Sequence, residues 1–201
     1  MTTGSGLRER IQVQRLIHCP EANAFTWKIE RNTWAAVEQD ARNNLFSSIG
    51  IGARGLTFTL RRNPRLTLHN AFLWRGQFCF LTAITDGAPG FQTVRAALAE
   101  PVVLTAEPQD RKGRDTLNRP KAIQQASFTF PGILTEKYIR NEVEEVYRAT
   151  ACQRVLVTPK AIRLRAGDLV QLGMELPYTI RQVMDLDPYK NEYVIERQEE
   201  V

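Results

Sequence analysis

Short segments in which polar and apolar residues alternate dominate the chain. The clearest are residues 10–17, 56–60 and 127–130. Because successive side chains of a β-strand point to opposite faces of a sheet, a period of two predicts strands with one buried face. The chain is therefore expected to be all-β.

Each half of the chain contains a short strand followed by a predicted hairpin. In the first half, residues 66–68 precede residues 72–84, which turn near Gly76. In the second half, residues 162–164 precede residues 169–183, which turn near Gly173. Glycine readily takes the positive φ that a tight turn requires. Small antiparallel β-barrels all use such hairpins, and the chain could form one barrel or two tandem barrel-like domains with long loops. The repeated order leaves an internal duplication and a chance similarity equally open.

Helix signals are few. Residues 34–47 and 93–100 could each hold one short helix. Residues 134–147 combine a mixed pattern with a run of charges, which is typical of a short helix or of an extended segment at the surface. These segments leave the expectation of a mainly β chain unchanged.

A polar segment separates the two halves. The chain has 201 residues, which is enough for one large domain or two small ones. Residues 107–121 contain two prolines, one glycine, five basic residues and three acidic ones, a composition typical of a linker or a long exposed loop. The expected organisation is a β-barrel over residues 1–107, a basic linker or long loop over 108–121, and a second barrel-like domain over 122–201.

The charge balance is mildly basic, with 27 Lys and Arg against 22 Asp and Glu. Such a surface could face nucleic acid, or the charge could simply keep the protein soluble. No run of 18 apolar residues is present, and the first ten residues contain no apolar signal core. We therefore expect no membrane partner and synthesis in the cytoplasm.

Residues that usually carry catalysis or bind metals are sparse. His18 and His69 both lie on strand-like segments, where a structural role is expected. The three cysteines, at positions 19, 79 and 152, form no CxxC pair, so neither a zinc ribbon nor a redox motif is present. Asp185 and Asp187 could bind a metal, although an Asp-Leu-Asp-Pro turn is the simpler interpretation.

Glycine-rich and nucleophile motifs are also absent. Residues 50–55 match the letters of a dinucleotide-binding loop only loosely, and a strand follows them where the motif requires a helix. No nucleophile elbow, zinc-protease or Walker motif occurs in the sequence. The chain is therefore expected not to be an enzyme and to have no catalytic residue, cofactor or metal.

Five segments carry a resemblance to a known family. Residues 7–15 (LRERIQVQR) resemble the opening strand of tailed-bacteriophage head–tail joining proteins, and residues 32–38 (NTWAAVE) resemble the Trp-Ala-x-Val-Glu strand that follows in that family. Residues 66–77 (LTLHNAFLWRGQ) are similar to its strand, turn and hairpin. Residues 166–170 (AGDLV) and 178–183 (YTIRQV) resemble the Gly-Asp and Tyr-x-Ile-x-x-Val hairpin of the same small barrels.

The resemblance implies a structural role in the neck of a virion. Head–tail joining proteins are small β-barrels that form a homo-oligomeric ring, with a portal or adaptor protein above and a tail-completion or tail-terminator protein below. The ring surrounds the DNA channel, and a loop often closes it. Such proteins are usually about one barrel long, whereas this chain is expected to hold two.

By analogy with that family, loops would supply the channel plug or the docking surfaces. The candidate loops are residues 39–55 and 107–121, which contain basic residues that could contact packaged DNA without reading its sequence. The candidate residues are Arg54, Arg111, Lys112, Arg114, Arg119 and Lys121.

Two other classes remain open. An OB-like nucleic-acid-binding module is favoured by the basic charge and by basic residues interleaved with Phe58, Phe72 and Trp74, and it predicts salt-dependent binding of short oligonucleotides. The aromatic residues occupy alternate positions beside apolar ones, however, which favours a place in the core. An enzyme with a poorly marked site, such as a hydrolase, is the third class.

Overall fold

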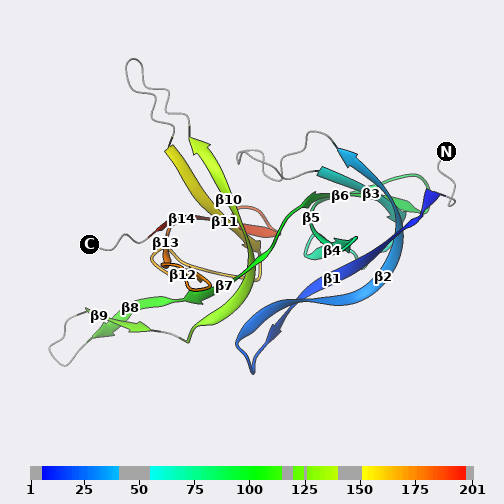
Figure 1. The fold of residues 1–201 in the computed structure, drawn as a ribbon. Coiled ribbons are helices and arrows are strands. Elements are labelled where there is room, and N and C mark those ends of the chain that lie inside the picture. The colour runs from blue at the N-terminus through cyan, green and yellow to red at the C-terminus, as the bar shows by residue number, and fades with distance from the viewer. Residues whose placement is uncertain (1–5, 41–54, 115–119, 125, 140–150, 198–201) are drawn as a thin grey trace, which may run out of the picture. The chain divides into compact units, whose positions relative to one another are not determined.

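The computed structural model describes residues 6–40, 55–114, 120–124, 126–139 and 151–197 (Figure 1). These residues form fourteen strands and no helix, so the expectation of an all-β chain is confirmed. The chain divides into two compact units. Unit 1 consists of Met1–Ile17 and Trp27–Pro101, and unit 2 consists of His18–Thr26 and Val102–Val201.

Six strands form unit 1, and their pairings close on themselves. The strands are β1 (Glu9–Cys19), β2 (Ala24–Asp40), β3 (Gly55–Arg61), β4 (Asn70–Trp74), β5 (Gln77–Asp86) and β6 (Phe91–Leu98). The pairings run β1-β4-β5-β6-β3-β2, and β1 also pairs with β2, which completes a six-strand ring. Such closure leaves no unpaired sheet edge around the ring itself.

The interior of the unit 1 ring is apolar, as the alternating pattern predicts. Phe58 lies edge-on to Phe72, with ring centroids 5.2 Å apart, and to Trp74 at 6.3 Å. All three side chains belong to one core cluster, which also contains Ile11 and Ala35. The aromatic residues that could have formed a stacking surface therefore fill the core.

The hairpin β4–β5 turns where the sequence places a glycine. Arg75 and Gly76 both have positive φ, at 51° and 78°. The strands pair directly on either side of the turn, with Trp74 opposite Gln77. A two-residue connection with positive φ at both positions is the turn that matches the twist of the flanking strands.

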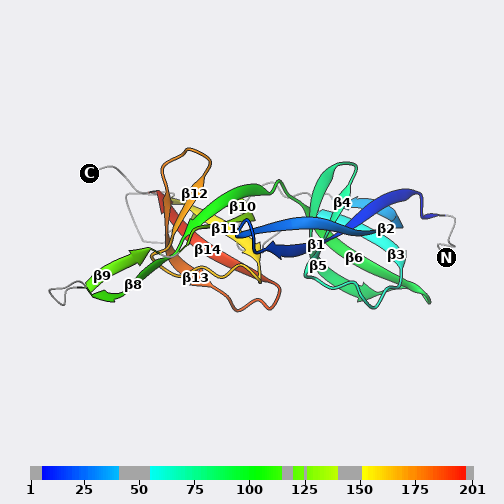
Figure 2. The ribbon, with the colours of Figure 1, turned by 90° about the horizontal axis from the view of Figure 1, so that it is seen from below.

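Unit 2 contains a second six-strand ring (Figure 2). Its strands are β7 (Val102–Glu107), β10 (Phe128–Ile139), β11 (Ala151–Pro159), β12 (Leu169–Leu172), β13 (Tyr178–Met184) and β14 (Lys190–Arg197). The order is β10-β11-β14-β13-β12-β7, and the antiparallel pairing of β10 with β7 closes it. Gly132 lies at a crowded point of this ring, because a Cβ there would come within 2.7 Å of the side chains of Leu104 and Leu156.

A buried polar network fixes the connection between β11 and β12. The carbonyl oxygen of Ile162 accepts hydrogen bonds from the Tyr193 hydroxyl at 2.9 Å and from the Asn191 amide at 2.7 Å. The Tyr193 hydroxyl in turn accepts the Leu164 N–H at 3.2 Å. Burial of Tyr193 raises its pKa above the ordinary value, because ionisation would place a charge away from water. The network therefore holds an irregular segment with its main-chain groups satisfied.

The tip of the β1–β2 hairpin belongs to unit 2. Asn23, at φ 43°, donates its side-chain amide to the Ser127 carbonyl at 2.8 Å, and its own carbonyl accepts the Thr129 N–H at 3.1 Å. Ala24 pairs with Thr129 in a parallel arrangement, and Phe25 lies 6.0 Å from Phe128. A segment near the N-terminus is thus packed on β10, more than 100 residues later.

The segment expected to be a linker or loop is largely a hairpin. Strands β8 (Gln109–Arg114) and β9 (Pro120–Gln124) form a separate two-stranded antiparallel sheet, and Gly113 pairs with Lys121. Proline and glycine suggested irregular chain, but Pro120 is the first residue of its strand, where a missing N–H is tolerated. We call this pair of strands the basic arm.

The two expected helices were wrong where the structure describes them. Residues 93–98 belong to β6, and residues 34–40 belong to β2. Ala96 and Ala97 are both buried on β6, where β3 and β5 flank them on the two sides. Residues 41–47 and 140–147 of the other helix candidates lie outside the described residues. Residues 134–139 are extended within β10, one of the two interpretations left open.

Candidate docking and nucleic-acid surfaces

Four of the six candidate basic residues lie on the basic arm. Arg111, Lys112 and Arg114 belong to β8, and Lys121 belongs to β9. The register places Lys121 opposite Gly113, next to Arg114, so the arm gathers these positions although they lie up to ten residues apart. Arg54 and Arg119 lie outside the described residues, as does most of the candidate loop 39–55. Within that loop, Gln39 and Asp40 are the last residues of β2.

A buried carboxylate anchors the root of the basic arm. Asp168 is only 3% exposed, and its Oδ1 accepts the Gln109 N–H at 2.9 Å while its Oδ2 accepts the Arg165 N–H at 2.7 Å. The main-chain carbonyl of Asp168 also accepts the Ile180 N–H at 3.0 Å. The first residue of β8 is therefore tied to the ring of unit 2.

The sequence identified Asp168 only as part of a turn. The Ala-Gly-Asp segment does turn, with Gly167 at φ 94°. The long-range bond from Asp168 to Gln109 has no local signal, because the two residues lie 59 positions apart. Only the polarity of a lone Asp before an apolar strand could have suggested that its carboxylate needs a main-chain partner.

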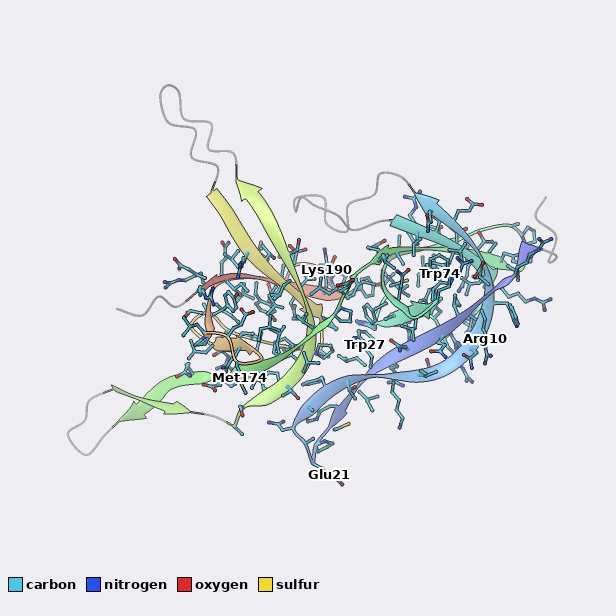
Figure 3. The ribbon with its side chains drawn as sticks, viewed as in Figure 1. Arg10, Glu21, Trp27, Trp74, Met174 and Lys190 are labelled. Carbon is cyan, nitrogen blue, oxygen red and sulfur yellow. The ribbon has the colours of Figure 1, made fainter. Side chains whose placement is uncertain are left out.

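Large apolar side chains are exposed at several places, and the sequence analysis missed them. Unit 1 exposes Ile29 and Trp34 on β2. In unit 2, Met174 lies in the β12–β13 turn (Figure 3). Leu176 lies in the same turn, and Leu186 lies in the β13–β14 turn. Exposed apolar side chains rimmed by polar residues can mark a surface that contacts other proteins.

Trp34 borders an open hollow on unit 1. Its side chain is 56% exposed, and Leu7, Thr33 and Arg61 line the hollow with it. Ala35 pairs with Leu60 across β2 and β3, so Trp34 and Arg61 are neighbours at the end of that ladder. Among the described lining residues, the site combines the apolar side chains of Leu7 and Trp34 with the cationic side chain of Arg61.

The turn accounts for the carboxylate of Asp187. The Oδ1 atom of Asp187 accepts the main-chain N–H groups of Tyr189 and Lys190, at 2.7 and 3.1 Å. This is the Asx-type arrangement that favours Asp in turns. Over the described part of the chain, no group of three or more His, Cys, Asp or Glu side chains is placed to hold a metal ion.

His18 and Cys79 pack or bond locally. His18 stacks on Phe25, with centroids 4.7 Å apart, and its Nε2 lies 3.4 Å from the Asn23 side-chain oxygen. Cys79 is fully buried in the core of unit 1, and burial raises the pKa of its thiol to about 12. A thiol with so high a pKa carries almost no thiolate at neutral pH.

One ion pair joins the start of β1 to the β4–β5 turn. The Arg75 guanidinium donates two hydrogen bonds to the Glu9 carboxylate, one to Oε1 at 2.6 Å and one to Oε2 at 3.1 Å. The Trp74 indole N–H also donates to Oε2, at 3.2 Å. These hydrogen bonds lower the pKa of the Glu9 carboxyl below its ordinary value. The contact links the ring interior, through Trp74, to the surface.

The comparisons with known proteins define no relative. No family model, no curated protein and no solved structure matches the chain. Among the described residues, no helix has the length and apolar character needed to span a bilayer. The class that can be stated is an all-β protein with two closed rings of six strands, a two-stranded basic arm and exposed apolar turns.

Proposed function

We propose that the chain is a non-enzymatic structural component of the neck of a tailed bacteriophage. In this role it forms a ring assembly beneath the portal, joins head to tail, and helps retain packaged DNA. Its partners would be a portal or adaptor protein above and a tail-completion or tail-terminator protein below. It would be made in the host cytoplasm and become part of the virion.

The segments that resemble head–tail joining proteins coincide with strands of both units. Residues 7–15 lead into and form much of β1, and residues 32–38 lie on β2. Residues 66–77 contain β4 and the turn into β5, and residues 178–183 lie on β13. The resemblance therefore falls on the elements that build the six-strand rings.

The observation that carries the proposal is the basic arm. Its two strands pair only with each other among the described strands, and they extend from the closed ring of unit 2 (Figures 1 and 2). Four basic residues lie on it, and Asp168 ties its first residue to the ring. A positively charged arm anchored at its root can contact the phosphates of passing DNA without reading bases.

A second arm in unit 2 offers another place for contact. Strand β11 pairs with β14 from Arg154 onward, whereas its pairing with β10 extends to Ala151. Residues 137–139 and 151–153 thus form a two-stranded ladder beyond the ring. Because the six-strand rings are closed, neighbouring copies would meet through turns and arms.

The proposal is tested on DNA-filled heads that carry a portal. The purified chain is mixed with them, and negative-stain images of the portal vertex are compared with images of heads alone. The expected result is extra ring-shaped density at that vertex only. A chain that never binds the vertex, with or without a purified adaptor protein, overturns the proposal.

The same preparation distinguishes the nucleic-acid-binding alternative. A chain that ignores heads and stays monomeric, but binds short oligonucleotides at low salt, would be an OB-like module. The exposed Trp34 beside Arg61 would then be the stacking site to test, because an aromatic face next to a guanidinium accepts an unpaired base.

A further inference from the structure

We infer that neighbouring copies of this chain contact each other head to tail, with the β13–β14 turn of one copy seated in the Trp34 hollow of the next. This inference rests on the proposed ring assembly and names the surfaces that build it. The turn is residues 185–188, with Leu186 at its tip. The hollow is the site lined by Leu7, Thr33, Trp34 and Arg61.

The turn presents an apolar tip between two carboxylates. Leu186 is 98% exposed, and it lies between Asp185 and Asp187. Asp187 uses one oxygen to accept the N–H groups of Tyr189 and Lys190, so the turn has a defined shape before any contact forms. The Lys160 amine donates to the main-chain oxygen of Asp185, which fixes the other side of the turn. A preformed turn loses little conformational entropy on docking.

The hollow offers the complementary surface. Trp34 supplies an exposed apolar face and Leu7 a second one, and together they match the leucine at the tip of the turn. Arg61 supplies a cation at the rim, where the carboxylate of Asp185 would lie. The hollow is open to solvent and has a volume of about 480 Å³, which exceeds that of one leucine side chain.

The charges of the two units favour this pairing. Unit 1 carries twelve Lys and Arg against six Asp and Glu, a net charge of +6, whereas unit 2 carries fifteen against sixteen, a net charge of −1. Residues 109–124 hold five of the basic residues of unit 2 and two of its acidic ones. The rest of unit 2 therefore has ten basic residues against fourteen acidic ones, a net charge of −4. Opposite charges steer unit 2 of one copy toward unit 1 of another.

The other apolar turn of unit 2 is less suited to the hollow. Met174 is fully exposed, but the adjacent Glu175 accepts the Tyr178 hydroxyl, which itself receives the Arg154 guanidinium. The Glu175 carboxylate is therefore already hydrogen-bonded to Tyr178, next to the Arg154 guanidinium. The Met174 turn therefore serves as the matched control.

A contact between two different surfaces has a direction. Each copy would offer one turn and one hollow, so copies add in sequence until a rotation closes the ring. Removal of either surface from every copy stops assembly. Two copies that each lack a different surface still retain one intact contact between them.

Because two copies that lack different surfaces can still form one contact, a pair of complementary variants tests the proposal. Trp34→Ala removes the hollow, and Leu186→Ser removes the tip, while circular dichroism checks that each variant keeps the β fold. Sedimentation velocity of the full-length chain is expected to show oligomers for the wild type and monomers for either variant. Truncation of a central Trp or Leu anchor is expected to weaken association about 30-fold or more. An equimolar mixture of the two variants is expected to form heterodimers and nothing larger.

Three further variants separate the contact from general effects of mutation. Met174→Ser changes an equally exposed apolar turn and should leave association unchanged. Arg61→Glu should weaken association, and Asp185→Lys in the same chain should restore it, because the pair is then reversed. A merely structural role of either residue would give no such restoration.

The outcomes decide between the two proposals. A wild-type chain that stays monomeric, or a mixture of variants that gives no heterodimer, overturns this contact. Wild-type oligomers that survive Trp34→Ala and Leu186→Ser overturn the contact and leave the neck proposal intact. Oligomers that depend on both residues but never bind portal-bearing heads support the contact and count against the neck.

Discussion

The carboxylate of Asp168 accepts the main-chain N–H of Gln109 at 2.9 Å, across 59 positions of sequence. Its other oxygen accepts the N–H of Arg165, so one buried side chain joins the β12 corner to the root of the basic arm. Hydrogen bonds to a buried charge are among the stronger single contacts in a protein. The position of the arm therefore depends on this residue.

Asp168→Ala is expected to lower the free energy of unfolding by about 3 kcal/mol, because two N–H groups would be deprived of a charged acceptor. Urea unfolding measures the change, and hydrogen exchange at the Gln109 amide should become faster. Asp187→Ala is the matched control, since it also removes an acceptor of two N–H groups, but in an exposed turn where water replaces it. An equal cost for the two variants would contradict the anchoring role.

The Glu9–Arg75 contact predicts an acid-sensitive part of stability. The folded-state pKa of Glu9 lies below its ordinary value of 4.5, because Arg75 and Trp74 donate hydrogen bonds to the carboxylate. A depressed pKa contributes stability that is present above pH 4.5 and disappears as the pH falls through the folded value. Thermal unfolding of wild type and Glu9→Gln between about pH 7 and pH 3 tests this. The gap between the two midpoints should shrink on acidification, and a constant gap would refute the assignment.

Gly132→Ala is expected to destabilise unit 2 by about 1–3 kcal/mol, because the added Cβ would lie 2.7 Å from two buried leucine side chains. Denaturant unfolding measures the change. Gly87→Ala is the control, since its nearest neighbour, Thr93 Oγ1, would lie at an ordinary 3.4 Å. Shortening one neighbour with Leu156→Val should cost less in the Gly132→Ala chain than in the wild type. Additive costs would argue against a steric clash.

Cys79 is expected to resist thiol reagents in the folded protein for two reasons. Its pKa of about 12 leaves almost none of the reactive thiolate at neutral pH, and its full burial keeps the reagent from reaching the sulfur. The half-buried Cys19 should react. Titration of a Cys152→Ser chain with a chromogenic disulfide at about pH 8 checks this, with one thiol expected to react before denaturant is added and two after it. Rapid reaction of both native thiols would contradict the burial of Cys79.

Strand identity could be predicted from the sequence because each ring has one buried face. Residues 56–60 alternate, and Leu56, Phe58 and Leu60 do lie in the core of unit 1. The helix predicted from residue 93 onward was wrong, because residues 93–98 belong to a strand. Small side chains such as alanine suit a helix and a crowded sheet equally well. Ala96 and Ala97 are both buried in the folded protein. That burial depends on strands that are distant in the sequence, so the residues next to the two alanines do not indicate it.

The candidate surfaces were only partly predictable. Basic residues at 111–121 stood out by composition, but their arrangement as two paired strands depends on a register that the sequence does not indicate. Trp34 and Ala35 are adjacent apolar residues on opposite faces of β2, and the pattern does not say which face is buried. Phe58 and Phe72 already fill the interior, so the small Ala35 points inward and Trp34 stays exposed.

The basic arm is expected to bind DNA through phosphates alone. Replacing Arg111, Lys112, Arg114 and Lys121 together by Gln should weaken binding to duplexes of any sequence. It should also reduce the steepness with which binding falls as salt rises, by up to about 0.9 for every phosphate that the variant no longer neutralises. Fluorescence anisotropy with two unrelated duplexes over a series of salt concentrations measures both effects. Arg163→Gln, which removes an exposed cation of unit 2 that is not part of the arm, should change neither. If the fourfold variant keeps the wild-type salt dependence, the basic arm does not carry the DNA contact that we propose for it.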